Sequence, residues 1–124
     1  MGFNSVETKW NADDEKFIIV MSIEDKLTNA FMNYDYQNIY TFLRVYRLHT
    51  APKFDSKIQD NMKETLEELS KLLKSLVEKK SEDDAKEFYL KAEELFLEIS
   101  QNLKESGFYY REGKDASHAV LRRN

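Results

Sequence analysis

The pattern that decides the fold lies in residues 55–79, DSKIQDNMKETLEELSKLLKSLVEK. Apolar residues recur there every three or four positions, which places them on one face of a helix: Ile58, Met62, Leu66, Leu69, Leu73 and Leu76. Leu72 and Val77 widen this stripe, so we expect the helix to contact two neighbours. Asp55 is a suitable N-cap, because its carboxylate can accept hydrogen bonds from the unpaired amides of the first turn. The sequence therefore predicts a helix from about Ser56 to Lys79.

A second long helix follows directly. Ser81 and Asp84 form an acidic variant of the capping box, and Gly107 suits the left-handed position at which a helix stops. The apolar face of this helix should hold Ala85, Phe88, Ala92, Leu95, Ile99 and Leu103. Two helices of about 24 residues, each roughly 36 Å long, are separated by one or two residues, so they must fold back on each other. We expect a long antiparallel helical hairpin over residues 55–106.

The first half of the chain is less regular. Residues 17–21, FIIVM, form a continuous apolar run that either ends a helix or makes a buried strand. The helix is favoured, because no other segment could pair with such a strand. Ser22 opens a motif like a capping box and predicts that a separate short helix begins there. Asp35 follows a bend and caps a further helix from Tyr36 to about Thr50.

The composition indicates one all-α domain. The 124 residues are 41% hydrophobic and 34% charged, with 3 Gly, 1 Pro and no Cys. These numbers exclude a disulfide scaffold, a cysteine nucleophile and a glycine-rich phosphate loop, and they argue against a chain of many short strands. We predict a small bundle of about four helices, dominated by the long antiparallel hairpin at the C-terminal side.

The predicted domain has four parts. Residues 1–12 form an N-terminal arm, residues 13–50 hold the short helices, residues 55–106 form the hairpin, and residues 108–124 form an aromatic and basic C-terminal arm. The hairpin has more apolar surface than two short helices comfortably cover. Self-association is the usual remedy, so we expect a homo-oligomer or a small subunit of a larger assembly.

The net charge and the length of the apolar runs indicate which partners and which cellular compartment to expect. The net charge is −4, with the acidic excess concentrated in residues 54–106. Such a surface disfavours nonspecific binding of nucleic acid by the whole molecule. No apolar run approaches the ~18 residues of a transmembrane helix, and the N-terminus lacks the pattern of a signal peptide. We expect a cytoplasmic protein that does not bind membranes.

The helix over residues 36–50 has an unusual composition. Tyr36, Tyr40 and either Arg44 or Arg47 fall on one face. Aromatic rings beside guanidinium groups suit a protein interface, where Tyr and Arg are enriched, and they also suit stacking on bases beside phosphates. Alternatively, the tyrosines lie at the edge of the core and the arginines pair with the acidic hairpin. We treat these four residues as candidates for partner binding.

Two of the chain's residues also fit a catalytic motif. Arg44 and His49 spell Arg-x4-His, a spacing that resembles the motif of HEPN-type ribonucleases, small helical domains whose paired Arg and His lie in a dimer cleft. The resemblance implies that His49 moves a proton from a ribose 2′-hydroxyl and that Arg44 stabilises charge on the phosphorane. Arg111 and His118 give a second match, Arg-x6-His. Val45 stands where the family often has a polar residue, and a histidine near a helix end more often faces the last carbonyls.

The sequence contains few residues that could bind a metal or a cofactor. The chain has two histidines and no cysteine, and neither histidine lies on the predicted hairpin. A zinc cage or a di-iron site of the Glu-x-x-His type therefore lacks its ligands. We predict no metal and no cofactor.

The C-terminal arm is the other candidate for partner binding. Aromatic residues follow the end of the hairpin and arginines end the chain, and the candidate residues are Tyr109, Tyr110, Arg111, Arg122 and Arg123. Such an arm either folds back across the acidic hairpin or binds a partner. We hypothesise that its aromatic residues anchor it to the bundle and that its terminal arginines remain free.

The sequence as a whole favours a non-catalytic helical module for protein–protein interaction and assembly, of the kind common in viruses and mobile elements. Two alternatives stay open. One is a nucleic-acid-binding protein that uses helix 36–50 and the basic tail. The other is a metal-independent ribonuclease that uses Arg44 and His49.

Overall fold

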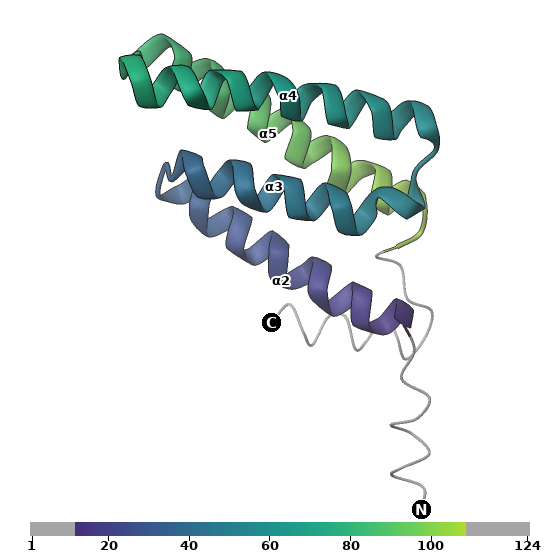
Figure 1. Cartoon of the computed structure of the whole chain (residues 1–124). Helices are drawn as coiled ribbons and strands as arrows, with labels where there is room; N and C mark the ends of the chain where they lie inside the picture. The colour runs from purple at the N-terminus through teal and green to yellow at the C-terminus, as the bar shows by residue number, and fades with distance from the viewer. Residues whose placement is uncertain (1–11, 109–124) are drawn as a thin grey trace, which may run out of the picture.

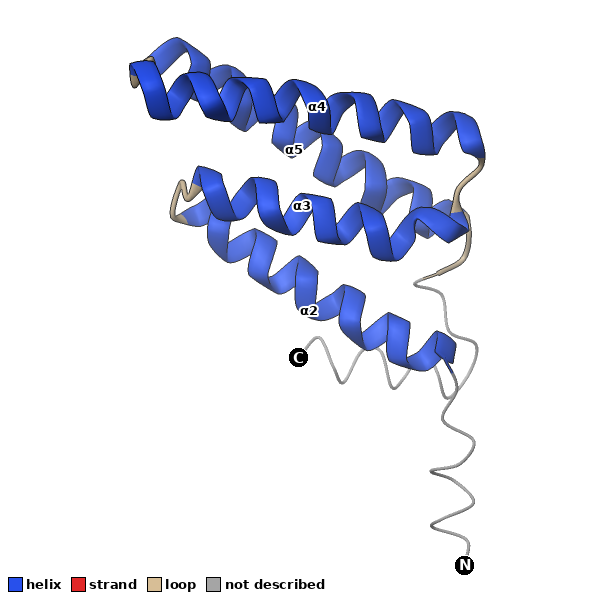
Figure 2. Ribbon diagram, viewed as in Figure 1, coloured by secondary structure: helices blue, strands red, loops and turns tan. Residues whose placement is uncertain are grey.

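The computed structural model describes residues 12–108, and its secondary structure there is helical throughout (Figures 1 and 2). The four α-helices are α2 (Ala12–Met32), α3 (Tyr36–Thr50), α4 (Ser56–Lys79) and α5 (Glu82–Glu105), and a short 3-10 helix, η1 (Ala51–Lys53), links α3 to α4. No strand occurs within the described part of the chain. The predicted all-α bundle of four helices is confirmed.

Local signals in the sequence set the ends of three helices. The Asp35 carboxylate accepts a hydrogen bond from the Asn38 amide at 3.2 Å, and Asp55 accepts one from Ile58 at 2.9 Å. Ser81 accepts one from the amide of Asp84 at 3.2 Å. Each bond satisfies an amide that the helix itself leaves unpaired. The predicted helices 36–50 and 56–79 are confirmed, and the second arm of the hairpin ends at Glu105, followed by Gly107 with φ +80°.

The prediction for the N-terminal half needs one correction. The run at residues 17–21 belongs to a helix, as favoured, but no separate helix begins at Ser22, because α2 continues through it. Its buried positions run on without a break: Phe17, Val20, Ile23, Leu27, Ala30 and Phe31. One continuous buried face therefore overrides the local start signal, and Ser22 lies exposed on the opposite side.

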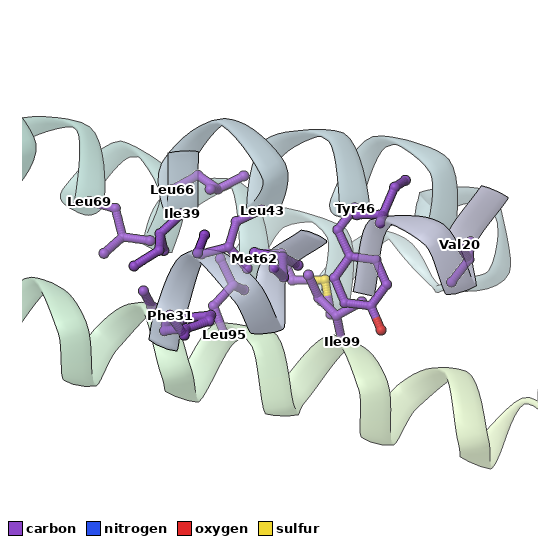
Figure 3. Packing of buried hydrophobic residues seen from close by; sticks show 14 of the residues in the cluster. Val20, Phe31, Ile39, Leu43, Tyr46, Met62, Leu66, Leu69, Leu95 and Ile99 are labelled. Carbon is purple, nitrogen blue, oxygen red and sulfur yellow. The ribbon is translucent and has the colours of Figure 1, made fainter. Parts of the chain in front are cut away.

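The helices are arranged around the α3–α5 pair. α3 packs against α2, α4 and α5, while α4 and α5 form the antiparallel hairpin. α2 and α4 therefore lie on opposite sides of this pair, as Figure 1 shows with α4 uppermost and α2 lowest. Figure 3 shows side chains from all four helices meeting in one core. Its fully buried members include Ile39, Leu43, Met62, Leu69, Leu95 and Ile99.

The hairpin is covered only along part of its length. In the first half of α4, Met62 and Leu69 are fully buried. In the second half the stripe continues through Leu73 and Leu76, which are half-buried. Val77 is 68% exposed. The cover that α2 and α3 provide thus thins toward the turn between α4 and α5.

Candidate functional site

The residues predicted to bind a partner lie at the edge of the core on α3. Tyr36 and Tyr40 are half-buried against the core, and Arg44 is exposed. One helical turn separates Tyr40 from Arg44, and the guanidinium carbon of Arg44 lies 5.7 Å from the centroid of the Tyr40 ring. This geometry is that of a cation–π contact, worth about 0.5–1 kcal/mol at an exposed site. The structure therefore brings Tyr40 and Arg44 together at the surface.

Arg47 lies one turn further along α3 than Leu43. Its side chain is half-buried, and its Nε atom is buried without a hydrogen-bond acceptor among residues 12–108. A buried donor without an acceptor destabilises a fold by about 1–3 kcal/mol. Among the partner-binding candidates on α3, only Arg47 has a buried donor atom without an acceptor in the described part of the chain.

The two candidates for ribonuclease chemistry do not converge within one copy. Arg44 and His49 are five positions apart on α3, which separates them by about 140° around the helix. Arg44 is exposed, whereas His49 is half-buried. The second match, Arg111 and His118, lies outside the described residues.

The candidates of the C-terminal arm also lie outside the described residues: Tyr109, Tyr110, Arg111, Arg122 and Arg123. Phe108, the first aromatic residue after the hairpin, is described and half-buried. Its ring centroid lies 5.7 Å from that of Phe17 on α2, and the Lys53 ammonium lies 5.7 Å from its centre. The chain therefore leaves the hairpin beside the first half of α2.

A buried polar cluster that the sequence did not reveal joins three helices. Tyr46 on α3 is fully buried, and its hydroxyl donates a hydrogen bond to the Glu24 carboxylate on α2. The same hydroxyl lies 2.9 Å from the Ser100 hydroxyl on α5. Burial raises the pKa of the Tyr46 phenol, and the neighbouring Glu24 charge raises that pKa further. The phenol therefore stays neutral and acts as a structural tie.

Three tyrosines cluster where α2 turns into α3. Tyr34 is 62% exposed and adopts a left-handed backbone conformation with φ +52°. Its ring centroid lies 5.3 Å from that of Tyr89 on α5, and Tyr36 packs edge-on against Phe88. Partial burial, together with nearby Tyr34, Glu93 and Tyr36, raises the pKa of the Tyr89 phenol. Interactions of the α2–α3 loop and of α3 with α5 thus close this end of the bundle.

The outward-facing side of α3 is basic. We define the α3 outer face by Tyr40, Arg44, Arg47 and Leu48, of which Leu48 is 67% exposed. α3 contains two arginines and no acidic residue.

The outward-facing side of α5 is acidic. We define the α5 outer face by Leu90, Glu93, Glu94 and Leu97, with Leu90 60% and Leu97 63% exposed. α5 carries eight acidic and three basic residues. α3 and α5 pack against each other, and the residues that they bury, such as Leu43 and Leu95, belong to neither outer face.

The described helices offer neither a metal-binding cluster nor a membrane-spanning segment. Among residues 12–108 there is no group of three or more histidine and carboxylate side chains placed to hold a metal ion. In the same residues, no helix has the length and apolar character required to cross a membrane.

Comparisons of the chain with protein-family models, with curated proteins and with solved structures found no match.

Proposed function

We propose that this protein is a non-catalytic helical assembly module that associates with further copies of itself. The observation that carries the proposal is the incomplete cover of the hairpin. Val77, Leu90 and Leu97 are 68%, 60% and 63% exposed, and the stripe of α4 loses cover in its second half. Burying a leucine fully is worth about 1.5–3 kcal/mol, so contact with another copy has a driving force along this hairpin.

The charge distribution supports a protein partner over a nucleic acid. The chain has a net charge of −4, and α5 carries most of the acidic excess, so a phosphate backbone meets repulsion over much of the surface. The contact between Arg44 and Tyr40 suits a protein interface, where both residue types are enriched. The proposal places the module in the cytoplasm, because a helical chain without cysteine needs no oxidising compartment.

Sedimentation equilibrium tests the proposal. We expect the wild-type chain to form oligomers between about 1 and 200 µM, and we expect a variant with Val77, Leu90 and Leu97 all changed to Gln to stay monomeric. The matched control changes three exposed glutamates of the same hairpin to Gln, namely Glu78, Glu87 and Glu105. This control should associate like the wild type.

Two results contradict the proposal. One is a wild-type chain that remains monomeric throughout the concentration range. The other is the detection of bound RNA or DNA when the purified protein is weighed by native mass spectrometry. Bound nucleic acid would favour the nucleic-acid-binding alternative on the Tyr40 and Arg44 side of α3.

A further inference from the structure

Two faces at the surface of this molecule carry the same pattern with opposite charge, and on α3 Tyr40 is half-buried while Arg44 and Leu48 are exposed. Along the α3 outer face, Tyr40, Arg44 and Leu48 follow one another at intervals of four, giving the order apolar, basic, apolar. Along the α5 outer face, Leu90 and Leu97 flank the pair Glu93–Glu94, giving the order apolar, acidic, apolar.

The two patterns also have nearly the same length. Tyr40 and Leu48 are eight residues apart, or about 12 Å along the helix, and Leu90 and Leu97 are seven apart, or about 10.5 Å. The charged residues lie near the middle of each pattern. When the apolar residues of one face are aligned with those of the other, Arg44 therefore comes opposite the two glutamates.

The residues that α3 and α5 bury in the core of one copy belong to neither face, so both faces remain available to a second copy. We propose that the α3 outer face of one copy binds the α5 outer face of a second copy. The inference rests on the proposed self-association and names the two surfaces that meet. Each contact leaves one α3 face and one α5 face unused, so the assembly is head-to-tail and forms a closed ring or a continuing row.

Charge complementarity favours a second copy as the occupant. α5 offers two glutamates in a row on this face, and α3 has no acidic residue to repel them. Association also removes Leu48, Leu90 and Leu97 from water.

The test uses two complementary variants of the whole chain. The α3 variant carries Arg44→Glu and Leu48→Glu, and the α5 variant carries Leu90→Glu and Leu97→Glu. We expect each alone to lose at least about thirty-fold in the affinity of self-association, a size typical of central interface residues. Lys71→Glu, an exposed lysine on α4 outside both faces, is the matched control and should associate normally.

Mixing the two variants gives the decisive result. Each retains the face that the other lacks, and the two altered faces are both acidic and repel. The mixture should therefore form a 1:1 dimer that grows no further, visible by native mass spectrometry. Thermal unfolding checks that each variant folds, and Gln replaces Glu at the same positions in any variant that does not.

Three outcomes overturn the inference while the proposed function stands. In the first, either variant associates like the wild type. In the second, both are monomeric alone and stay monomeric when mixed, which assigns the interface to other surfaces or to a two-fold arrangement. In the third, a variant's melting temperature falls well below that of Lys71→Glu at a concentration where both are monomeric, which shows that its face is covered within the chain. A wild-type chain that is monomeric at every concentration overturns the proposed function itself.

Discussion

The hydroxyl of Tyr46 connects three helices through one atom. It donates to the Glu24 carboxylate on α2 and lies 2.9 Å from the Ser100 hydroxyl on α5, while the ring packs edge-on against Phe96. Buried polar groups stabilise a fold when they are satisfied and destabilise it when one partner is removed. The cluster should therefore fix how α2 and α5 lie relative to α3.

The pH dependence of the stability of Tyr46→Phe tests the contribution of this hydroxyl. Removing the hydroxyl should lower the free energy of unfolding by about 1–3 kcal/mol at pH 8. Burial raises the pKa of Tyr46 in the folded chain, so its contribution is fully present below pH 10. Above pH 10 the unfolded chain ionises while the folded chain does not, and stability is lost at up to about 1.4 kcal/mol per pH unit. The difference in the free energy of unfolding between the wild type and Tyr46→Phe should therefore become smaller above pH 10.

Urea unfolding at pH 8, 9, 10 and 11 measures this difference directly. The remaining tyrosines, including Tyr89 with its raised pKa, are common to both chains, so their titration largely cancels. Parallel pH profiles for the wild type and Tyr46→Phe would show that the phenol does not contribute in this way.

The sequence alone does not reveal the role of Tyr46. The helical spacing places it on the apolar side of residues 36–50, and it is fully buried there. Its polar partners lie 22 and 54 residues away in the chain. Periodicity within one helix carries no information about such distant partners, because they are determined by how the helices pack.

The helix ends are decided by a few local residues, and one of them is not optimal. α4 ends at Lys79, and the next residue, Lys80, is its C-cap, an exposed residue with φ +52° whose amide donates to the Leu76 carbonyl. A side chain in this left-handed conformation costs roughly 1–2 kcal/mol, whereas glycine adopts it freely. After the greater entropy of an unfolded glycine is subtracted, Lys80→Gly should raise the free energy of unfolding by about 0.5–1 kcal/mol.

The neighbouring residue supplies the control for this prediction. Lys79 is the last residue of α4, so Lys79→Gly removes the same side chain and charge from a right-handed position and should lower stability by up to about 1 kcal/mol. Thermal or urea unfolding of the two variants should thus give effects of opposite sign. If both variants were destabilised equally, the Lys80 side chain would stabilise the fold by more than its left-handed backbone conformation destabilises it.

Capping residues in the sequence predicted the starts of the helices correctly wherever no continuous buried face ran through them. Asp35, Asp55 and Ser81 cap the helices that follow them, as their side chains predicted. Ser22 carries a similar signal and starts nothing, because the apolar positions of α2 continue through it into a single buried face. Burial along a whole helix outweighs one cap, which is worth about 1 kcal/mol.

The sequence also predicted how much cover the hairpin needs, but not where that cover falls. The stripe of α4 is evident from spacing alone, yet Met62 and Leu69 are fully buried while Leu73 and Leu76 are only half-buried. That division depends on where α3 crosses the hairpin. Which sides of α3 and α5 stay uncovered likewise depends on how these two helices pack in the bundle. Both are properties of the assembled bundle.

The assembled molecule permits a charge-exchange test of the head-to-tail contact. Arg44→Glu and Glu93→Lys each place like charges opposite one another, and each should weaken self-association by about five- to ten-fold. A chain that carries both changes restores an opposite pair, so its association should return to within about threefold of the wild type. Sedimentation equilibrium at low and at ~0.5 M salt measures the coupling, which should fade at high salt because screening shortens the reach of charge. Losses that simply add would place Arg44 and Glu93 in different contacts, since only facing residues can compensate for each other.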